Sequence, residues 1–259
     1  MIFTARRLPG AGSLKHFLEY AGGVALMLVD SVRYVVTMRV SPAEIVRQAY
    51  FLGVESWPII VLTSLFTGLV ISLEAAAQAA SYGFSNFVGG SVAYGEVREL
   101  GPMLTGIVFA GRAGAAITAS LGSMVVTEQI EALQSMGVSP VKALVAPRVL
   151  ACLVTVPMLT VFADIVGVYG GYYMASLRAH ISSYIYWHSV QTTIDFSDFT
   201  KGLFKAAVFG AVVALIGCYE GFRAEGGAEG VGRVTTHAVV TSVILIFAFN
   251  FALSFVLFP

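Results

Sequence analysis

Five long stretches of apolar residues, separated by shorter polar segments, dominate the pattern of the chain. An α-helix needs about 20 mostly apolar residues to cross the hydrocarbon core of a bilayer, with a range of about 17–25. Each stretch reaches this length and carries few charged residues. The pattern therefore predicts five membrane-spanning helices, at residues 57–80, 100–126, 149–175, 203–222 and 237–258.

A sixth stretch, residues 22–38, has a weaker apolar pattern. It is only 17 residues long and contains Asp30 and Arg33. Its apolar residues recur at roughly helical spacing with polar residues between them, which is typical of a helix that lies in the membrane interface. We therefore favour an interfacial helix at this place over a sixth span.

Composition points to the same class of protein. Apolar residues make up 57% of the chain and charged residues only 12%, against about 25% charged residues in a soluble domain. This chain is therefore predicted to be an all-α integral membrane protein. It forms a single domain over 1–259, with an N-terminal cytoplasmic or interfacial segment over about 1–50 and a five-span region over 51–259. Cys152 and Cys218 lie within apolar stretches, so we expect buried free thiols.

Basic residues in the loops set the expected orientation, because cytoplasmic loops carry an excess of lysine and arginine. If the N-terminus is cytoplasmic, ten basic residues lie on the inner side and three, Arg178, Lys201 and Lys205, on the outer side. The sequence therefore predicts a cytoplasmic N-terminus and a C-terminus on the opposite side. The ten inner residues are Arg6, Arg7, Lys15, Arg33, Arg39, Arg47, Lys142, Arg148, Arg223 and Arg233.

Ionisable residues at the outer end of the second span form a candidate site. Charges at membrane depth cost about 2.5–3.5 kcal/mol each at a helix centre and are functional candidates by default. Arg98 and Glu99, with Glu96 nearby, directly precede Pro102, which is expected to mark a break or the first turn of the span. An arginine beside carboxylates can bind a lipid phosphate. The alternative is an ion pair between two copies of the chain.

A second intramembrane arginine, Arg112, lies deeper in the same span. It needs a carboxylate or free carbonyl groups nearby, and Asp164 in the third span lies at a comparable depth. We therefore expect a buried structural pair of Arg112 and Asp164 rather than a substrate contact. Small residues around Arg112 predict close packing in a bundle or a dimer. The sequence offers neither metal-ligand spacing nor a hydroxyl with matched histidine and carboxylate, so we assign no metal and no catalytic residue.

The segment between the second and third spans predicts a short helix followed by a turn. Residues 127–136 are good helix formers, Gly137 is placed for a left-handed cap, and Ser139–Pro140 opens the next helix. A ten-residue helix is marginal in isolation and must dock on something. Its apolar residues either pack on the chain's own spans or insert into a groove on another subunit. These residues are Ile130, Leu133 and Met136, with Glu128 and Glu131 on the remaining surface.

Four motifs follow one another along the chain: Gln48-x-x-x-x-Gly53, Arg98-Glu-Leu-Gly-Pro102, Phe109-Ala-Gly-Arg-Ala-Gly114 and Glu128-x-x-Glu131-Ala-Leu-x-x-Met136-Gly137-Val-x-Pro140. They resemble, in order and spacing, the motifs of MlaE-type permeases, the membrane subunits of ABC systems that move phospholipids between the two membranes of Gram-negative bacteria. The similarity covers about residues 45–259.

The resemblance implies a homodimer in the bacterial inner membrane with a periplasmic C-terminus and a lipid cavity between the subunits. Arg98 and Glu99 would line this cavity, opposite Leu73, Glu74, Gln78 and Tyr82 of the first span. The segment from Glu128 to Pro140, including Gly137, would be the coupling helix that inserts into a cytoplasmic ATPase subunit. A periplasmic MCE-type lipid-binding protein, and in some systems a STAS-domain protein, would complete the transporter, with no nucleic-acid partner.

Two features separate this function from its alternatives. The chain lacks any Gly-Lys pair and therefore a phosphate-binding loop, so ATP and Mg²⁺ would bind the partner ATPase and this chain needs no cofactor. An ion-coupled secondary carrier is the first alternative, motivated by the intramembrane charges, but the chain shows no internal repeat of the kind such carriers often have. A membrane scaffold that recruits a soluble partner is the second.

Overall fold

The computed structural model describes residues 13–37, 41–82 and 85–258, and every regular element in this part of the chain is helical. In chain order the elements are α1 (Ser13–Val36), α2 (Pro42–Ala49), η1 (Tyr50–Val54), α3 (Trp57–Tyr82), η2 (Ser85–Phe87), α4 (Val88–Gly95), η3 (Glu96–Leu100), α5 (Gly101–Phe109), η4 (Ala110–Gly114), α6 (Ala115–Val126), α7 (Gln129–Ser135), η5 (Val141–Val145), α8 (Ala146–Ala179), α9 (Ser183–Thr193), α10 (Phe196–Gly221) and α11 (Gly227–Leu257).

Five helical segments are long and apolar enough to span a membrane, which confirms the predicted number. The last four spans are longer than predicted, because the charges and prolines that resemble boundaries in the sequence lie inside continuous helix. In the second span, the buried Glu96 and the partly buried Arg98 and Glu99 lie within the helix and continue it. The observed spans are Trp57–Ala79, Val88–Val126, Val141–Ala179, Phe196–Gly221 and Gly227–Leu257.

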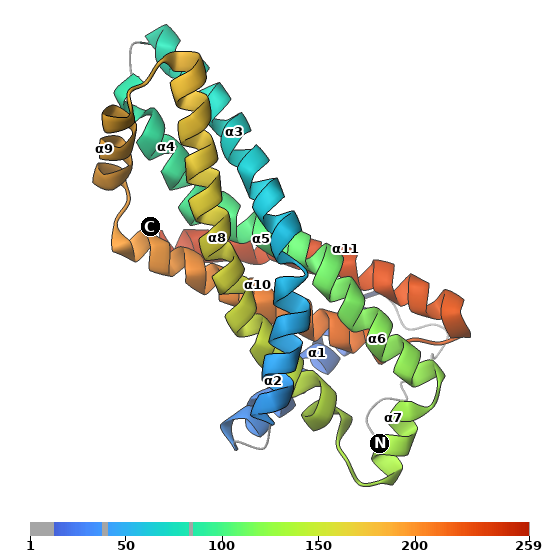
Figure 1. The fold of residues 1–259 in the computed structure, drawn as a ribbon. Helices are drawn as coiled ribbons and strands as arrows, with labels where there is room; N and C mark the ends of the chain where they lie inside the picture. The colour runs from blue at the N-terminus through green and yellow to red at the C-terminus, as the bar shows by residue number, and fades with distance from the viewer. Residues whose placement is uncertain (1–12, 38–40, 83–84, 259) are drawn as a thin grey trace.

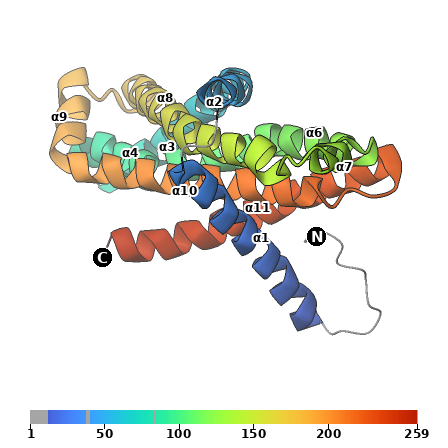
Figure 2. The ribbon, with the colours of Figure 1, turned by 90° about the horizontal axis from the view of Figure 1, so that it is seen from below.

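The spans form a bundle in which α10 is the most enclosed and α11 the most exposed (Figures 1 and 2). α3 packs along α8, while α10 packs against α8, the second span and α11. Glycine allows the closest of these approaches, because a Cβ at Gly68 of α3 would collide with the carbonyl oxygen of Gly167 on α8. The main apolar core lies between the second, third and fourth spans. Phe109, Phe209 and the unbonded Cys152 are fully buried in it.

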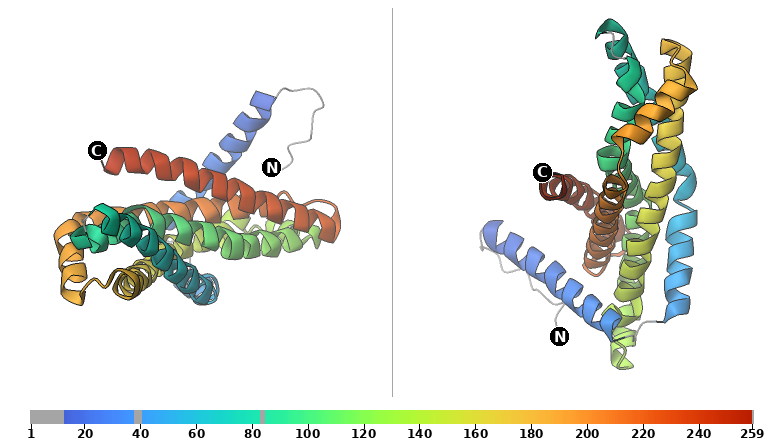
Figure 3. Two further views of the ribbon diagram at one scale, coloured as in Figure 1. Left: turned by 90° about the horizontal axis from the view of Figure 1, so that it is seen from above. Right: turned by 90° about the vertical axis from the view of Figure 1, so that its left-hand side faces the viewer.

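The N-terminal helix α1 extends obliquely away from the bundle (Figure 3). It is attached through an edge-to-face contact of Tyr20 with Tyr219 on α10, with ring centroids 4.9 Å apart, and Gly23 leaves the space that the Tyr219 ring fills. With 24 residues, α1 is long enough to cross a bilayer, but it is not apolar enough to be one of the five spans. Its place in the membrane interface stays a prediction.

The predicted connector helix is present as α7, which is seven residues long instead of ten. It is shorter because Glu128 adopts a left-handed conformation, with φ 61°, that separates α7 from the second span. Gly137 ends the helix with φ 75°, as predicted. Its N–H donates to the carbonyl of Gln134 at 2.9 Å, and the N–H of Val138 donates to Leu133 at 3.0 Å. These two bonds satisfy carbonyls that the helix end leaves free.

Candidate functional site

A proline in the second span frees a backbone carbonyl that a buried lysine binds. η3 is a π-helical turn directly before Pro102, and proline has no N–H to donate to the carbonyl four residues earlier. That carbonyl belongs to Arg98, and it accepts a hydrogen bond from Nζ of Lys205 on α10 at 2.8 Å. The Lys205 side chain is 0% exposed. Because a buried ammonium needs pairing and hydrogen bonds, the irregular helix and the lysine form one structural unit.

Glu99 joins this unit to the last span. Its Oε2 lies 2.9 Å from Nζ of Lys205 and accepts a hydrogen bond from Nδ2 of Asn250, also at 2.9 Å. The hydroxyl of Ser254 lies 2.8 Å from Oε1. The second, fourth and fifth spans therefore meet at one carboxylate. The Glu99 side chain is 37% exposed, so it also faces the outside of the chain.

Arg98 lies beside Glu99 and is held by two aromatic rings and one carboxylate. Its guanidinium carbon lies 4.3 Å from the ring centroid of Tyr94 and 3.8 Å from that of Phe258. Its Nε is 3.7 Å from Oδ1 of Asp198 at the start of α10. Arginine over aromatic faces is attracted by the ring quadrupole. The guanidinium of Arg98 thus has its partners within the chain, whereas part of the Glu99 carboxylate is exposed.

The residues of the first span that were predicted to line the lipid cavity lie in the C-terminal part of α3. Leu73 is half-buried, and Glu74 and Gln78 are exposed. Tyr82 belongs to the last turn of α3, but its side chain lies outside the described residues. Within the part of the chain that the structure describes, Glu74 forms no ion pair with Arg98. A cavity lined by both groups within a dimer stays a prediction.

The expected pair of Arg112 and Asp164 is not formed in the structure. Arg112 instead forms an ion pair with Glu55, and its Nη1 donates to the carbonyls of Phe51 at 2.9 Å and Leu52 at 3.2 Å. Both acceptors belong to η1, which ends before α3 begins, and the break between the two elements leaves backbone carbonyls free for a side-chain donor. The requirement for a carboxylate or free carbonyls was therefore right, but the partner was wrong. The sequence does not show that the segment before the first span packs against η4.

The side chains of α7 divide between the chain and its surroundings. Ile130 is buried against the chain, Leu133 is half-buried, and Met136 is 69% exposed. Glu128 and Glu131 are exposed. α7 lies below α6 at one end of the molecule in Figure 1. Packing on the chain therefore accounts for Ile130, and it leaves the exposed side of α7 available to a partner.

Several polar residues of the site were not among the sequence predictions. The sequence places Lys205 on the outer side, at the start of the predicted fourth span, whereas α10 begins earlier, at Phe196, and places it further inside the span. Asp198 and the α11 residues Asn250 and Ser254 were not singled out. A signal for Lys205 exists in the sequence, since Pro102 within a span requires another donor for the Arg98 carbonyl. No sequence pattern identifies which donor satisfies it.

Comparison with known proteins gives consistent matches over most of the chain. The family model described as Permease MlaE matches residues 45–256. A probable ABC transporter permease protein of Rickettsia typhi is 36% identical over 258 residues, which is 100% of this chain and 99% of the relative. The intermembrane phospholipid transport system permease protein MlaE of Haemophilus influenzae is 33% identical over 215 residues, covering 83% of this chain and 82% of the relative.

Proposed function

Because the chain belongs to the MlaE permease family, we propose that it is the membrane-spanning subunit of an ABC transporter that moves phospholipids between the inner and outer membranes. The observation that carries the proposal is the extent of the match, since residues 45–256 include all five spans up to the end of α11 and the connector helix α7. The Haemophilus influenzae relative, named for intermembrane phospholipid transport, supports the cargo. ATP and Mg²⁺ would bind a separate ATPase subunit, and this chain would be non-catalytic.

We place the protein in the bacterial inner membrane with its N-terminus in the cytoplasm and its C-terminus in the periplasm. Basic residues near the ends of the spans support this orientation, because Lys142 and Arg148 lie at the start of the third span, next to α7, and Arg223 and Arg233 lie on either side of the start of α11. Figure 1 shows α7 toward one end of the molecule and α9 with the end of α11 toward the other. A homodimer, a periplasmic MCE-type protein and a STAS-domain protein are the further partners that the family resemblance implies.

The lipid headgroup is proposed to meet the charged unit around Arg98 and Glu99. Glu99 is open on one side, and Arg98 is held by a single carboxylate at 3.7 Å, so an anionic phosphate is a suitable competitor for Asp198. Two copies of the chain would enclose the lipid between them. Leu73, Glu74, Gln78 and Tyr82 of α3 would supply the opposing wall.

The lipid site is testable by photo-crosslinking in the detergent-purified transporter. A photoreactive residue at position 98 should capture co-purified phospholipid, because lipid enclosed by protein survives delipidation. The matched control is position 173, where Tyr173 of α8 is 63% exposed and faces outward. Capture at position 173 together with clean failure at position 98 would move the site away from Arg98.

Coupling to the ATPase is proposed to pass through α7. The exposed Met136 offers an apolar anchor beside the acidic Glu128 and Glu131, and the ordered Gly137 turn fixes the helix relative to the third span. Apolar anchors on a short helix that enters a groove are a common mode of partner binding. ATP-driven closure of the partner subunits would then move the spans through this connector, and Pro140 would transmit the motion to the third span.

Charge reversal on α7 tests the coupling. Replacing Glu128 and Glu131 together by lysine should weaken binding of the ATPase subunit at least about tenfold, or about 1.4 kcal/mol, as measured by co-purification and ATPase stimulation. The matched control reverses the exposed Glu225 and Glu229 around the start of α11, which changes the net charge equally. Unchanged ATPase binding in the α7 variant would exclude the docking role of this helix.

A further inference from the structure

Two buried carboxyl groups lie in the bundle apart from the charged unit around Arg98 and Glu99. Glu96 of η3 is 0% exposed and Asp164 of α8 is 4% exposed. Each fills the space left by a glycine on the facing segment, because a side chain at Gly167 would collide with Oε1 of Glu96, and one at Gly101 would collide with Oδ1 of Asp164. The reciprocal fit shows that the fold is built around these two side chains.

No basic group balances the pair within the described residues. The basic side chains of the neighbouring elements are committed elsewhere, Arg98 to Asp198 and Lys205 to Glu99. The facing α3 contributes only hydroxyls, and α8 contributes Asp164 itself. From α9 the phenol of Tyr186 comes near, but it donates to the carbonyl of Val168 at 3.0 Å, and burial raises its pKa.

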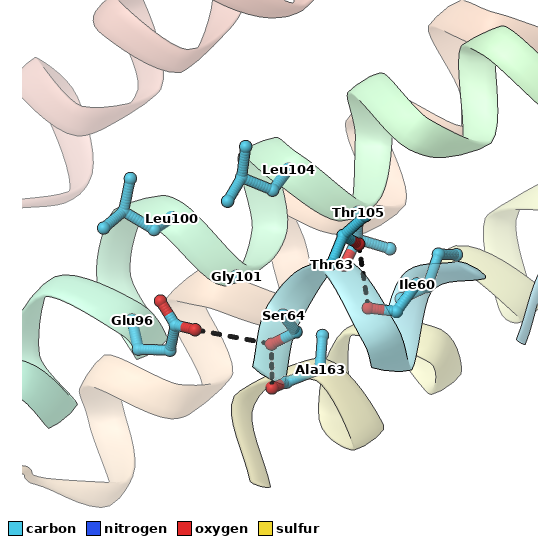
Figure 4. A pocket seen from close by; sticks show the side chains of 9 residues that line it. All are labelled: Ile60, Thr63, Ser64, Glu96, Leu100, Gly101, Leu104, Thr105 and Ala163. Carbon is cyan, nitrogen blue, oxygen red and sulfur yellow. Dashed lines mark hydrogen bonds between the residues drawn. The ribbon is translucent and has the colours of Figure 1, made fainter. Parts of the chain in front are cut away.

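The hydrogen bonds around Ser64 indicate where a proton lies. Ser64 of α3 stands between the carbonyl oxygen of Ala163 and Oε1 of Glu96, as Figure 4 shows. A hydroxyl has one hydrogen, and a carbonyl can only accept. The contact to Ala163 therefore takes the Ser64 hydrogen, because the carbonyl oxygen has none to donate. The 3.3 Å contact to Glu96 is then a hydrogen bond only if the carboxyl group supplies the proton.

The space beside Glu96 also limits what can bind there. It is lined by residues of α3, η3, α5 and α8, among them Leu100, Leu104 and Thr105, and it leaves no room for a water molecule. The hydroxyl of Thr105 is 2% exposed and, like Oε2 of Glu96 and Oδ1 of Asp164, has no hydrogen-bond partner among the residues that the structure describes. A hydrated cation therefore does not fit beside Glu96, whereas a proton bound to a carboxyl group needs no additional space.

We propose that Glu96 and Asp164 form an intramembrane proton-binding site in which Glu96 carries the proton and Ser64 accepts its hydrogen bond. Two like charges this deeply buried cannot both ionise without compensation. The site joins α3, the second span and α8, so loss of the proton favours separation of these three helices. Proton binding thereby couples pH to their packing. This inference is independent of the cargo and the ATPase.

Infrared spectroscopy of the full-length protein in a maltoside detergent, which has no carbonyl group, tests the site. The wild type should show the carbonyl band of a protonated carboxylic acid at neutral pH. Glu96→Gln should lose the part of the band that belongs to Glu96, whereas the exposed-residue control Glu225→Gln should leave the band unchanged. A wild-type spectrum without this band at neutral pH, or a Glu96→Gln spectrum in which the band keeps its full intensity, would overturn the proposal.

A second variant covers the case in which Glu96→Gln fails to fold. Ser64→Ala removes the acceptor of the proposed hydrogen bond, so the acid band should shift in frequency. An unshifted band would overturn the assignment of the proton to Glu96. Glu96→Gln is also isosteric with the protonated acid, so the folded variant should match the thermal stability of the wild type at neutral pH. Since the folded wild type holds more protons than its unfolded chain, its stability should fall as pH rises, and the variant should show a weaker fall.

Discussion

At the scale of single residues, two basic side chains of the spans bind backbone carbonyls where helices are irregular. The buried Lys205 binds the Arg98 carbonyl that Pro102 leaves without a donor, and the partly exposed Arg112 binds two carbonyls of η1. In a membrane, freed backbone groups must find partners within the protein. Each irregularity and its cation therefore satisfy one another.

The Lys205 contacts give a prediction on stability. Lys205→Met should lower the free energy of unfolding by about 2–3 kcal/mol, because three acceptors lose a charged donor in a buried place. Lys201→Met, one turn away on α10 and partly exposed, is the matched control and should cost under about 0.5 kcal/mol. Urea titration of the protein in detergent micelles measures both. Equal losses in the two variants would contradict the role of the Lys205 contacts.

At the scale of elements, the pairing of α3 with α8 depends on backbone contact. Gly68 and Gly167 meet without side chains between them, and Ser72 of α3 donates to the carbonyl of Gly171 on α8 at 2.6 Å. Small residues that allow close approach are the main source of helix association in lipid, where apolar burial gives no drive. The small residues in the spans therefore serve packing within the chain.

Alanine at Gly68 tests this contact. The added Cβ would meet the fixed carbonyl of Gly167, so Gly68→Ala should lower the free energy of unfolding by about 1–3 kcal/mol. Gly111→Ala is the matched control, since a Cβ there meets nothing within 4 Å, and it should be neutral or slightly stabilising in a helix. Thermal unfolding of the two variants side by side gives the comparison. A Gly68→Ala protein as stable as the wild type would show that α3 and α8 can move apart at this contact at little cost in free energy.

At the scale of the whole molecule, the chain presents two different ends. One carries α7 with its exposed Met136, and the other carries α9 with Tyr184, which is 77% exposed. Both described cysteines, Cys152 and Cys218, are fully buried. The unsubstituted protein should therefore be unreactive to thiol reagents, which makes the orientation of the two ends measurable by single introduced cysteines.

We expect Tyr184→Cys to react with a membrane-impermeant maleimide on intact spheroplasts. Met136→Cys should react only after the membrane is permeabilised, because α7 is placed in the cytoplasm. The unsubstituted chain is the control for background labelling. Labelling of both positions from the same side would show that the third span does not cross the membrane, and reversed labelling would invert the orientation.

The sequence by itself determined the class, the number of spans and the connector. These features depend on local sequence. A long run of apolar residues is stable as a helix that spans the bilayer, and Gly137 ends a helix because glycine adopts the left-handed backbone conformation without steric cost. The connector was predicted three residues too long, because nothing in its local sequence requires the left-handed Glu128.

Only the tertiary structure decided which charges meet. Arg112 pairs with Glu55 instead of Asp164, and Lys205 reaches Glu99 from within a span. Both partners are distant in sequence, and the depth of a residue in its span does not fix which face of a neighbouring helix it meets. The position of Glu96 beside Asp164 likewise follows from the reciprocal glycine contacts between helices. Burial then determines the protonation state, because a carboxyl group that is ionised at the surface holds its proton inside the bundle.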